Sequence, residues 1–351
     1  MSELLRIAIK DLEAFVARAY VAVGISAAEA KNIAELQVRA DLIGADGHGV
    51  FRLPQYVRRI KGQAVNLKPD IRVEREAPGM ALVNGDNGMG HLVMRFATEK
   101  AIEKAKTVGV AWVGVQNSNH AGPASLYASM PMAHDMIGLY LAVGNANHLP
   151  PWGGIDMLLS TNPIAVAVPA GQEPPIVLDM ATTVAAYGKV KTKAQRGEMM
   201  PEGWMMDRQG QPLLDPKKSN EGFLLPIGGY KGYGLSMIIG LLAGTLNGAA
   251  NGRDVVDFNV DDRTPTNTGH VIVAINVAMF QPVAEFKRSV DAFVRDIRNS
   301  QRLPGVEAIR LPGEGSHARL EESLRLGAPL SAPLLKSLND LAAELKIPAL
   351  S

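Results

Sequence analysis

Apolar side chains recur at helical spacing near the start of the chain. Over residues 4–19 they fall three or four positions apart, which predicts an amphipathic helix that ends at Gly24. The pair Ser26 and Glu29 has the spacing of a capping box, so we expect a second helix from there to about Gly44. A third, short helix is expected over residues 52–61, with Pro54 in its first turn.

From about residue 80 the pattern changes to short β-rich runs that alternate with helical segments. This alternation predicts a mixed α/β layer domain. The expected strands cover 81–84, 110–116, 137–143, 164–168, 176–178 and 270–276. The expected helices lie near 90–108, 123–136, 182–196 and 231–247.

Pro282 marks a further change of pattern. Residues 283–300 are again amphipathic, and the chain from about residue 320 is helical in pattern and suited to pack on the N-terminal helices. We therefore divide the chain into an N-terminal helical region (1–80), a mixed α/β domain (81–281) and a C-terminal helical region (282–351). The polar stretch 254–269 is expected to be a long loop.

Composition excludes several kinds of protein. The 351 residues include 36 basic and 35 acidic side chains, a net charge of +1, so no basic surface indicates a nucleic-acid partner. The absence of cysteine excludes disulfides, thiolate catalysis and cysteine-ligated zinc. The start has no signal-peptide pattern, and the most apolar run, 234–250, is too short for a membrane span. We expect a cytoplasmic protein with no membrane partner.

The stretch around His48 carries the strongest candidate chemistry. His48 lies between Gly47 and Gly49, and Arg52 follows four residues later, where a helix is expected to begin. The glycines leave the imidazole uncrowded, and the spacing can place a titratable ring beside a cation. That combination suits proton transfer next to a bound carboxylate. The alternative is a glycine-rich turn with a surface histidine.

Familiar nucleotide-binding fingerprints are missing. Residues 85–90 have the wrong spacing for the glycine motif of a Rossmann fold, and no phosphate-binding P-loop is present. Residues 228–234 are rich in glycine, contain Lys231 and precede an apolar helix, which suits a phosphate or a merely solvated lysine. The histidines and carboxylates have no metal-ligand spacing, so we expect no metal.

Other candidate residues follow expected strands. His120 lies in the polar segment 117–122 directly after a strand, where α/β proteins place functional groups, although a plain loop histidine is the alternative. Asp179 ends an apolar strand and could accept hydrogen bonds from ribose hydroxyls. Residues 311–315 have the composition of a turn.

Together and in this order, six motifs resemble one family. They are A-D-L-x-G-x-D-x-H-G-V-x-R-L-P-x-Y, N-S-N-H-x-G, S-T-N-P, D-M-A-T-T-x-x-A-x-G-K, G-x-K-G-Y-G-L and P-G-E, spread over residues 40–315. The chain resembles the malate/L-lactate dehydrogenase family of the second type. That family also includes ureidoglycolate dehydrogenase, sulfolactate dehydrogenase, diketogulonate reductase and Δ1-piperideine-2-carboxylate reductase.

The resemblance implies a fold and a reaction. The fold is a mixed α/β, sulfolactate-dehydrogenase-like, non-Rossmann fold, in which 81–281 binds NAD(P) on a mostly antiparallel sheet and both termini form a helical domain. The reaction is hydride transfer between a nicotinamide and C2 of a small 2-hydroxy or 2-oxo acid. The cofactor would be NAD or NADP, with NAD slightly favoured. The resemblance also implies a homodimer with sites near the subunit interface.

The resemblance assigns roles to residues motif by motif. His48 would exchange the proton with the substrate oxygen, Arg52 would hold the substrate carboxylate, and Thr161 and Gly47 would contact the substrate. In some relatives the histidine at the place of His120 is the acid/base, so the division of work between the two histidines stays open. The residues implied to bind the cofactor are His120, Ala121, Gly122, Pro123, Ala124, Asp179, Met180, Ala181, Lys231, Gly313, Glu314 and Gly315.

Two positions depart from the family pattern. Many relatives have serine where this chain has Gly47, so a hydroxyl is lost and the tautomer of His48 depends on another partner. Lys189 stands where some imine-reducing relatives carry an acidic residue. Two other hypotheses for the function remain. The protein could be a reductase of a cyclic imino acid or larger keto acid, or a non-catalytic sensor that binds a dinucleotide.

Overall fold

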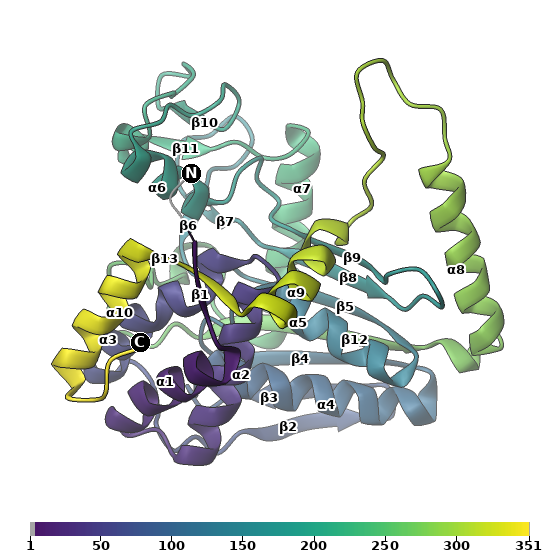
Figure 1. The fold of residues 1–351 in the computed structure, drawn as a ribbon, viewed down its shortest axis with the longest axis horizontal. Coiled ribbons are helices and arrows are strands. Elements are labelled where there is room, and N and C mark those ends of the chain that lie inside the picture. Colours follow the sequence, from purple (N-terminus) through teal and green to yellow (C-terminus); the bar gives the residue numbers. More distant parts are fainter. Residues whose placement is uncertain (1–3, 351) are drawn as a thin grey trace.

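A sheet of seven strands forms the centre of the molecule (Figure 1). In the computed structural model, which describes residues 4–350, the strand order is β2-β3-β4-β12-β5-β8-β9. The strands are β2 (Arg72–Ala77), β3 (Met80–Asn84), β4 (Val110–Ser118), β5 (Met136–Ala142), β8 (Ile164–Val168), β9 (Ile176–Met180) and β12 (Thr268–Asn276). Strands β3 and β4 pair in parallel, joined by helix α4 (Gly90–Val108), whereas the other neighbouring pairs are antiparallel. The mostly antiparallel, non-Rossmann sheet is therefore confirmed.

Helices cover both faces of this sheet. Helices α4 and α5 (Ala124–Ser129) pack on one face, where small residues such as Ala97 and Ala101 let α4 lie close to the strands. Helix α7 (Tyr230–Ile239) and the π-helical turn Gly240–Gly244 pack on the other face, against alternate residues of β5 and β12.

The two ends of the chain build a second, helical layer. Helices α1 (Ile9–Ala22), α2 (Ala27–Leu42) and α3 (Leu53–Lys61) share a core with α10 (Ala332–Leu345). Strand β1 (Leu4–Ile7) pairs antiparallel with β13 (Ala328–Ser331), and Figure 1 shows these purple and yellow segments together. The expected helical domain from both termini is confirmed.

Two segments project from this body. One is a small lobe with α6 (Tyr187–Arg196), β10 (Met205–Asp207) and β11 (Gly222–Leu224), which has its own apolar cluster. The other is helix α8 (Val283–Arg298) with the loop that leads to α9 (Glu314–Leu326) (Figure 1). Asp291 of α8 accepts hydrogen bonds from the backbone N–H groups of residues 171–173, next to β8. Helix α8 is thus attached to the sheet, and the division at residue 282 stays a prediction.

Several boundaries differ from the sequence prediction. Residues 4–7 form strand β1 rather than the start of a helix, because residues 328–331 supply its partner strand. Helix α6 begins at Tyr187 instead of 182, since Thr182 and Thr183 bond to Thr161 and Pro226. The C-terminal helical pattern near 320 is two helices, α9 and α10, separated by β13, and strand β2 was not predicted.

Other expectations are met closely. Helix α4 covers the predicted range, and the Ser26 hydroxyl oxygen accepts from the backbone N–H of Glu29 as the capping box requires. The short strands β6 (Asn147–Leu149) and β7 (Leu159–Ser160) form a separate pair beside the lobe. In residues 4–350, none of the helices combines the length and apolar character needed to cross a bilayer.

Candidate active site

His48 and Arg52 lie on consecutive 3-10 turns, Asp46–His48 and Val50–Arg52, directly before α3. The Nε–H of Arg52 donates to the carbonyl oxygen of Gly47 at 3.0 Å, so the guanidinium folds back beneath the turn of His48. Its Nη1 donates to the side chains of Gln55 (2.6 Å) and Asn259 (3.2 Å). These bonds occupy three of the five N–H groups of arginine. Within residues 4–350 no bond uses Nη2, which leaves this nitrogen for a carboxylate.

The second predicted histidine lies against the first. The ring of His120 stacks on the ring of His48, with centroids 5.6 Å apart and planes at 9°. It also stacks on Phe258, at 4.8 Å and 16°. The guanidinium carbon of Arg52 lies 5.2 Å from the centroid of Phe258. The structure therefore brings His48, His120 and Arg52 into one cluster, as the motifs predicted.

Hydrogen bonds decide which nitrogen of His120 carries the proton. The Tyr56 hydroxyl lies 2.5 Å from Nδ1 of His120, and the backbone N–H of Gly122 donates to the same atom at 3.4 Å. A backbone amide can only donate, so Nδ1 accepts and the proton of the neutral ring is on Nε2. His120 thus offers an N–H donor to a ligand.

The electrostatics of the cluster keep both rings neutral. Burial, and then the charge of Arg52, lower the pKa of His48 to about 4. Burial, followed by the neighbouring His48 and Arg52, lowers the pKa of His120 well below its usual value. A carboxylate bound to Arg52 would offset the guanidinium charge and so raise the pKa of His48.

Gly47 leaves space beside His48. A Cβ built on Gly47 would meet no described atom within 4 Å. Its φ is outside the left-handed region, so a side chain here needs no strained backbone. The position where many relatives carry serine is therefore open in this structure.

Three of the segments predicted to bind the cofactor lie together. Exposed Asp179, near the end of β9, accepts from the backbone N–H of Ser125 at 2.9 Å, just after residues 120–124. Val177 N–H donates to the carbonyl of Pro312 at 3.1 Å. Gly313 has φ 86° and lies so close to Val177 that a Cβ would be 2.8 Å from its carbonyl oxygen. The exposed carboxylate and the N-terminus of α9, which has no side-chain cap, suit ribose hydroxyls and a phosphate.

Thr161 and Lys231 are placed differently. The carbonyl of Thr161 accepts from both the N–H and the hydroxyl of Thr182, at 2.9 Å each. Within the described part of the chain, no hydrogen bond joins Thr161 to His48, His120 or Arg52. Lys231 is exposed at the start of α7. In the loop before it, the N–H of Ile227 donates a hydrogen bond to the carbonyl of Thr182. The structure ties these two residues to the end of β9, not to the histidine cluster.

Several residues of the cluster have no role that could be predicted from their motifs. Tyr56 on α3 lies four residues after Arg52, the residue that caps this helix, so both side chains lie on the same side. Phe258 is the one aromatic residue in the polar stretch 254–269, and its carbonyl accepts from Nε2 of Gln55 at 2.6 Å. A buried aromatic residue in a polar loop could have been recognised, but its contact with Arg52 could not.

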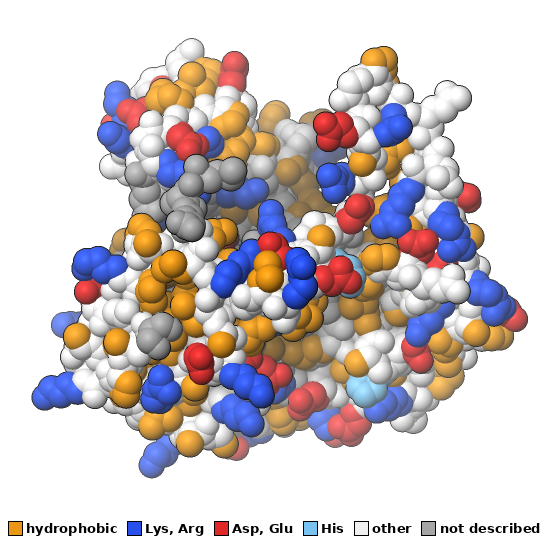
Figure 2. All heavy atoms as spheres, viewed as in Figure 1, with side chains coloured by type: hydrophobic (Ala, Val, Ile, Leu, Met, Phe, Trp, Pro, Cys, Tyr) orange, Lys and Arg blue, Asp and Glu red, His pale blue; other side chains and the backbone are white. Residues whose placement is uncertain are grey.

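A cavity of about 230 Å³ lies between the lobe and the segments around residues 147–148 and 257. Its walls include Asn147, His148, Tyr187, Arg208 and Asp257. Asp257 Oδ1 accepts from the backbone and side chain of Asn259, which itself binds Arg52. In Figure 2 the surface is hollowed between the lobe and the projecting loop.

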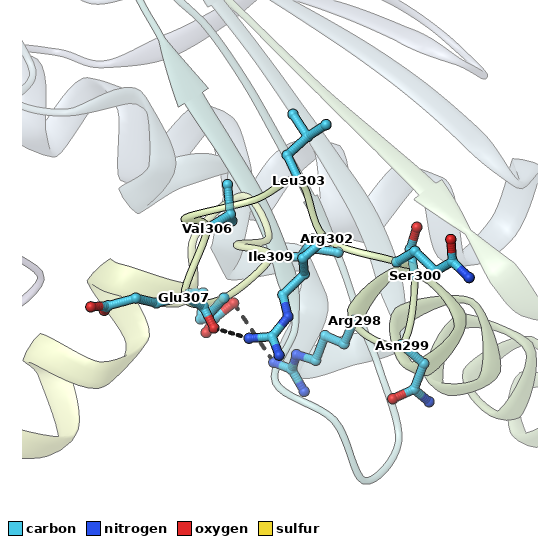
Figure 3. Close-up of a pocket in the computed structure, with 11 residues that line it drawn as sticks. Arg298, Asn299, Ser300, Arg302, Leu303, Val306, Glu307 and Ile309 are labelled. Atoms are coloured by element: carbon cyan, nitrogen blue, oxygen red, sulfur yellow. Dashed lines mark hydrogen bonds and ion pairs between the residues drawn. The ribbon is translucent and has the colours of Figure 1, made fainter.

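A larger groove, about 910 Å³, lies elsewhere (Figure 3). It is lined by residues 298–303 and 306–309 and by Glu314, so the loop after α8 forms most of its wall. Among the residues with predicted roles, it shares Glu314 alone. The smaller cavity is connected to Arg52 through Asp257 and Asn259.

Comparison with known proteins identifies the family. The family model of malate/L-lactate dehydrogenase matches residues 7–339. The chain belongs to this family. A malate dehydrogenase of Pyrococcus abyssi is 38% identical over 98% of this chain and 96% of its own length. An L-sulfolactate dehydrogenase of Methanocaldococcus jannaschii is 40% identical over 83% of both chains.

Solved structures agree with this membership. The malate dehydrogenase of Pyrococcus horikoshii has a TM-score of 0.91 and 34% identity, covering 100% of this chain and 99% of the other. The predicted family, fold and enzyme class are therefore confirmed: the chain is a dehydrogenase of 2-hydroxy acids. Its place in the family also implies a nicotinamide cofactor.

Proposed function

We propose that His48 exchanges the proton and Arg52 holds the carboxylate when this enzyme interconverts a 2-hydroxy acid and a 2-oxo acid. One observation carries the proposal: His48 and Arg52 lie on adjoining turns, linked by the bond from Arg52 Nε–H to the carbonyl of Gly47. A carboxylate on Nη2 then has its neighbouring C2 oxygen within reach of the histidine cluster.

The hydrogen bonds of the two histidines suit them to different roles. Nδ1 of His120 already accepts from Tyr56 and Gly122, so its Nε2–H can polarise the substrate oxygen but not remove a proton. The ring of His48 has no side-chain hydrogen bond among the described residues and is free to give or take the proton. Burial and then the charge of Arg52 lower the pKa of His48, and a bound carboxylate would offset the second of these two causes. A bound nicotinamide supplies or accepts the hydride.

For the cofactor we propose NAD. The exposed carboxylate of Asp179 suits the two hydroxyls of an unmodified ribose and would repel a 2′-phosphate. Residues 120–124, 179–181, 313–315 and Lys231 would hold the dinucleotide. Purified protein should oxidise NADH with 2-oxo acids at a higher kcat/KM than NADPH. Cofactor binding without turnover on 2-oxo or cyclic imino acids would instead favour a dinucleotide sensor.

Arg52→Lys is expected to raise KM for a 2-oxo acid and lower kcat, with about a 100-fold loss of kcat/KM. A lysine ammonium cannot bind the carbonyl of Gly47 and a carboxylate in the same planar arrangement. Steady-state kinetics with NADH measure the effect, and Arg288→Lys on the exposed side of α8 is the control. Unchanged kinetics for Arg52→Lys would remove this residue from the site.

We further propose that the substrate carries a second anionic group, as malate and sulfolactate do in the relatives' names. Lys191 supports this as a second cation on the lobe: burial, and then the charge of Arg52, lower its pKa, while Asp257 raises it. Its Nζ is 5.4 Å from the ring centroid of Tyr187, a wall of the smaller cavity.

Lys191→Met is therefore expected to lower kcat/KM for oxaloacetate about 5- to 10-fold, the effect of one exposed ion pair. The value for pyruvate, which has no second anion, should stay within about twofold. Lys193→Met is the matched control, since Lys193 on the same helix pairs with Glu198. Equal losses for both acids would contradict a role of Lys191 in selecting the substrate.

The homodimer implied by the family is also proposed here. Met237, Ile238, Leu241 and Leu246, on α7 and the turns after it, are 38% to 64% exposed. Apolar surface of this kind on a soluble protein marks an interaction site. Light scattering should give twice the chain mass, and Ile238→Glu should shift the protein toward monomer.

A further inference from the structure

The Gly49–Val50 peptide, one residue beyond His48, is held by two buried side chains of α2. Nε2 of Gln37 donates to the carbonyl oxygen of Gly49 at 2.9 Å. Oδ2 of Asp41 accepts from the N–H of Val50 at 2.8 Å. The two side chains are four residues apart, so they lie on one face of the helix. The group before His48, the carbonyl of Gly47, is bound by Arg52, and the histidine is thus fixed on both sides.

Gly49 permits this close contact. A Cβ on Gly49 would lie 2.2 Å from Oδ2 of Asp41 and 2.3 Å from its Cγ. Any side chain at this position would push the turn of His48 away from α2. The glycine after His48 is therefore required by the approach of Asp41, whereas Gly47 meets open space.

A third buried residue orients Gln37. The hydroxyl of Tyr20 lies 2.7 Å from Oε1 of Gln37. A carbonyl oxygen only accepts, so the amide nitrogen of Gln37 must face Gly49 and its oxygen must face Tyr20, which donates. Tyr20 and Gln37 are fully buried, which protects both bonds from competition by water.

The buried carboxyl group of Asp41 lowers the stability of the folded protein. It is 2% exposed, and Oδ1 has no hydrogen-bond partner within residues 4–350. Burial raises the pKa of its carboxyl well above the usual value, which favours the neutral acid. A buried polar group left partly unpaired lowers stability, because it loses its bonds to water without replacing them. An apolar residue at this position of α2 would pack with less loss of stability. The role of Asp41 is therefore in the hydrogen bond that its Oδ2 accepts from Val50.

We propose that Gln37 and Asp41 are positioning residues that fix His48 through the Gly49–Val50 peptide. The inference rests on the proposed role of His48 in proton exchange. It predicts that loss of either bond lets the turn move and separates the imidazole from the substrate oxygen. A displacement of about 1 Å can lower a rate about 100-fold.

The test uses Gln37→Leu, Tyr20→Phe, Asp41→Ala and Asp41→Asn in the full-length protein. We expect kcat for a 2-oxo acid to fall about 10- to 100-fold in the first and third variants, with NADH affinity within about twofold of wild type. Tyr20→Phe should give a smaller loss, because only the orientation of Gln37 is released. Asp41→Asn should regain most of the rate, since the amide oxygen can still accept from Val50.

Amide hydrogen exchange gives a second readout that needs no activity. The segment 45–52 should exchange faster in Gln37→Leu and Asp41→Ala than in wild type, while α4 keeps its protection. Thr98→Val is the control: it removes the buried hydroxyl that donates to the carbonyl of Met94 within α4, away from the turn of His48. It should leave both kcat and the exchange of 45–52 unchanged.

The outcomes separate the two proposals. If wild type reduces no 2-oxo acid, the proposed function fails, and exchange of segment 45–52 alone decides the inference. Unchanged exchange and unchanged kcat in Asp41→Ala would overturn it, as would an equal rate loss in Thr98→Val. If Gln37→Leu does not fold, Tyr20→Phe and the Asp41 pair decide in its place.

Discussion

Replacing His48 by asparagine is expected to lower kcat for 2-oxo acid reduction by about 100- to 10,000-fold, the usual contribution of a general acid or base. Asparagine keeps a polar group of similar size on the turn but cannot exchange a proton. NADH affinity should stay close to wild type, because His48 is not among the residues proposed to bind the cofactor. Single-turnover rates and NADH fluorescence measure the two quantities separately.

His120→Asn is the informative comparison. His120 is proposed to polarise the substrate oxygen through Nε2–H, and the asparagine amide can still donate there, so its rate loss should be smaller than that of His48→Asn. In wild type, kcat should change with pH as His48 titrates. This pH dependence should disappear in His48→Asn and remain in His120→Asn. A larger loss in His120→Asn, with the pH dependence retained in His48→Asn, would exchange the two roles.

The free energy of unfolding is expected to fall strongly in acid, because two histidines are buried in the neutral form. His91 and His270 are 0% and 2% exposed, and burial lowers their pKa values to about 3 and about 4. The unfolded chain binds protons at these groups near the ordinary pKa of about 6.5, whereas the folded protein does not. The free energy of unfolding should therefore fall as the pH drops below about 6.5, by up to about 1.4 kcal/mol per pH unit for each histidine. Between pH 6 and pH 4 the loss is several kcal/mol, a large part of the stability of an ordinary domain.

Urea unfolding at a series of pH values measures this slope. His91→Phe should flatten it by about 1.4 kcal/mol per pH unit, since neither ring nitrogen of His91 has a partner in the described structure to lose. Exposed His134→Gln should not change it. Asp41 acts in the opposite direction, because its raised pKa lets the folded state bind a proton first. The His91 comparison isolates the histidine from that effect, and an unchanged slope would contradict its neutral burial.

The sequence predicted the parts of the candidate site that lie close together along the chain. His48 and Arg52 share one motif, and each of the segments 120–124, 179–181 and 313–315 follows or opens a predicted element. Their polar residues sit where strands end or helices begin, which periodicity can locate. The resemblance of six ordered motifs then supplied the fold that periodicity alone left as a mixed α/β domain.

The contacts made by residues 257–259 were not predictable in the same way. Asn259 reaches Arg52 across 207 positions of sequence, and its loop has no periodic pattern that would show which face is buried. Strand β1 was mistaken for helix for a related reason. The apolar spacing of residues 4–7 fits either element, and only the distant partner β13 decides between them.

The open space at Gly47 bears on how this enzyme can evolve. A glycine codon GGC becomes the serine codon AGC by a single base change, and no described neighbour would have to move to admit the new side chain. Where the glycine codon ends in a pyrimidine, glycine and serine forms are therefore joined by one mutational step without a compensating change in the core. We expect such genes to exchange these two residues often, and a library randomised at this codon to yield folded protein with either.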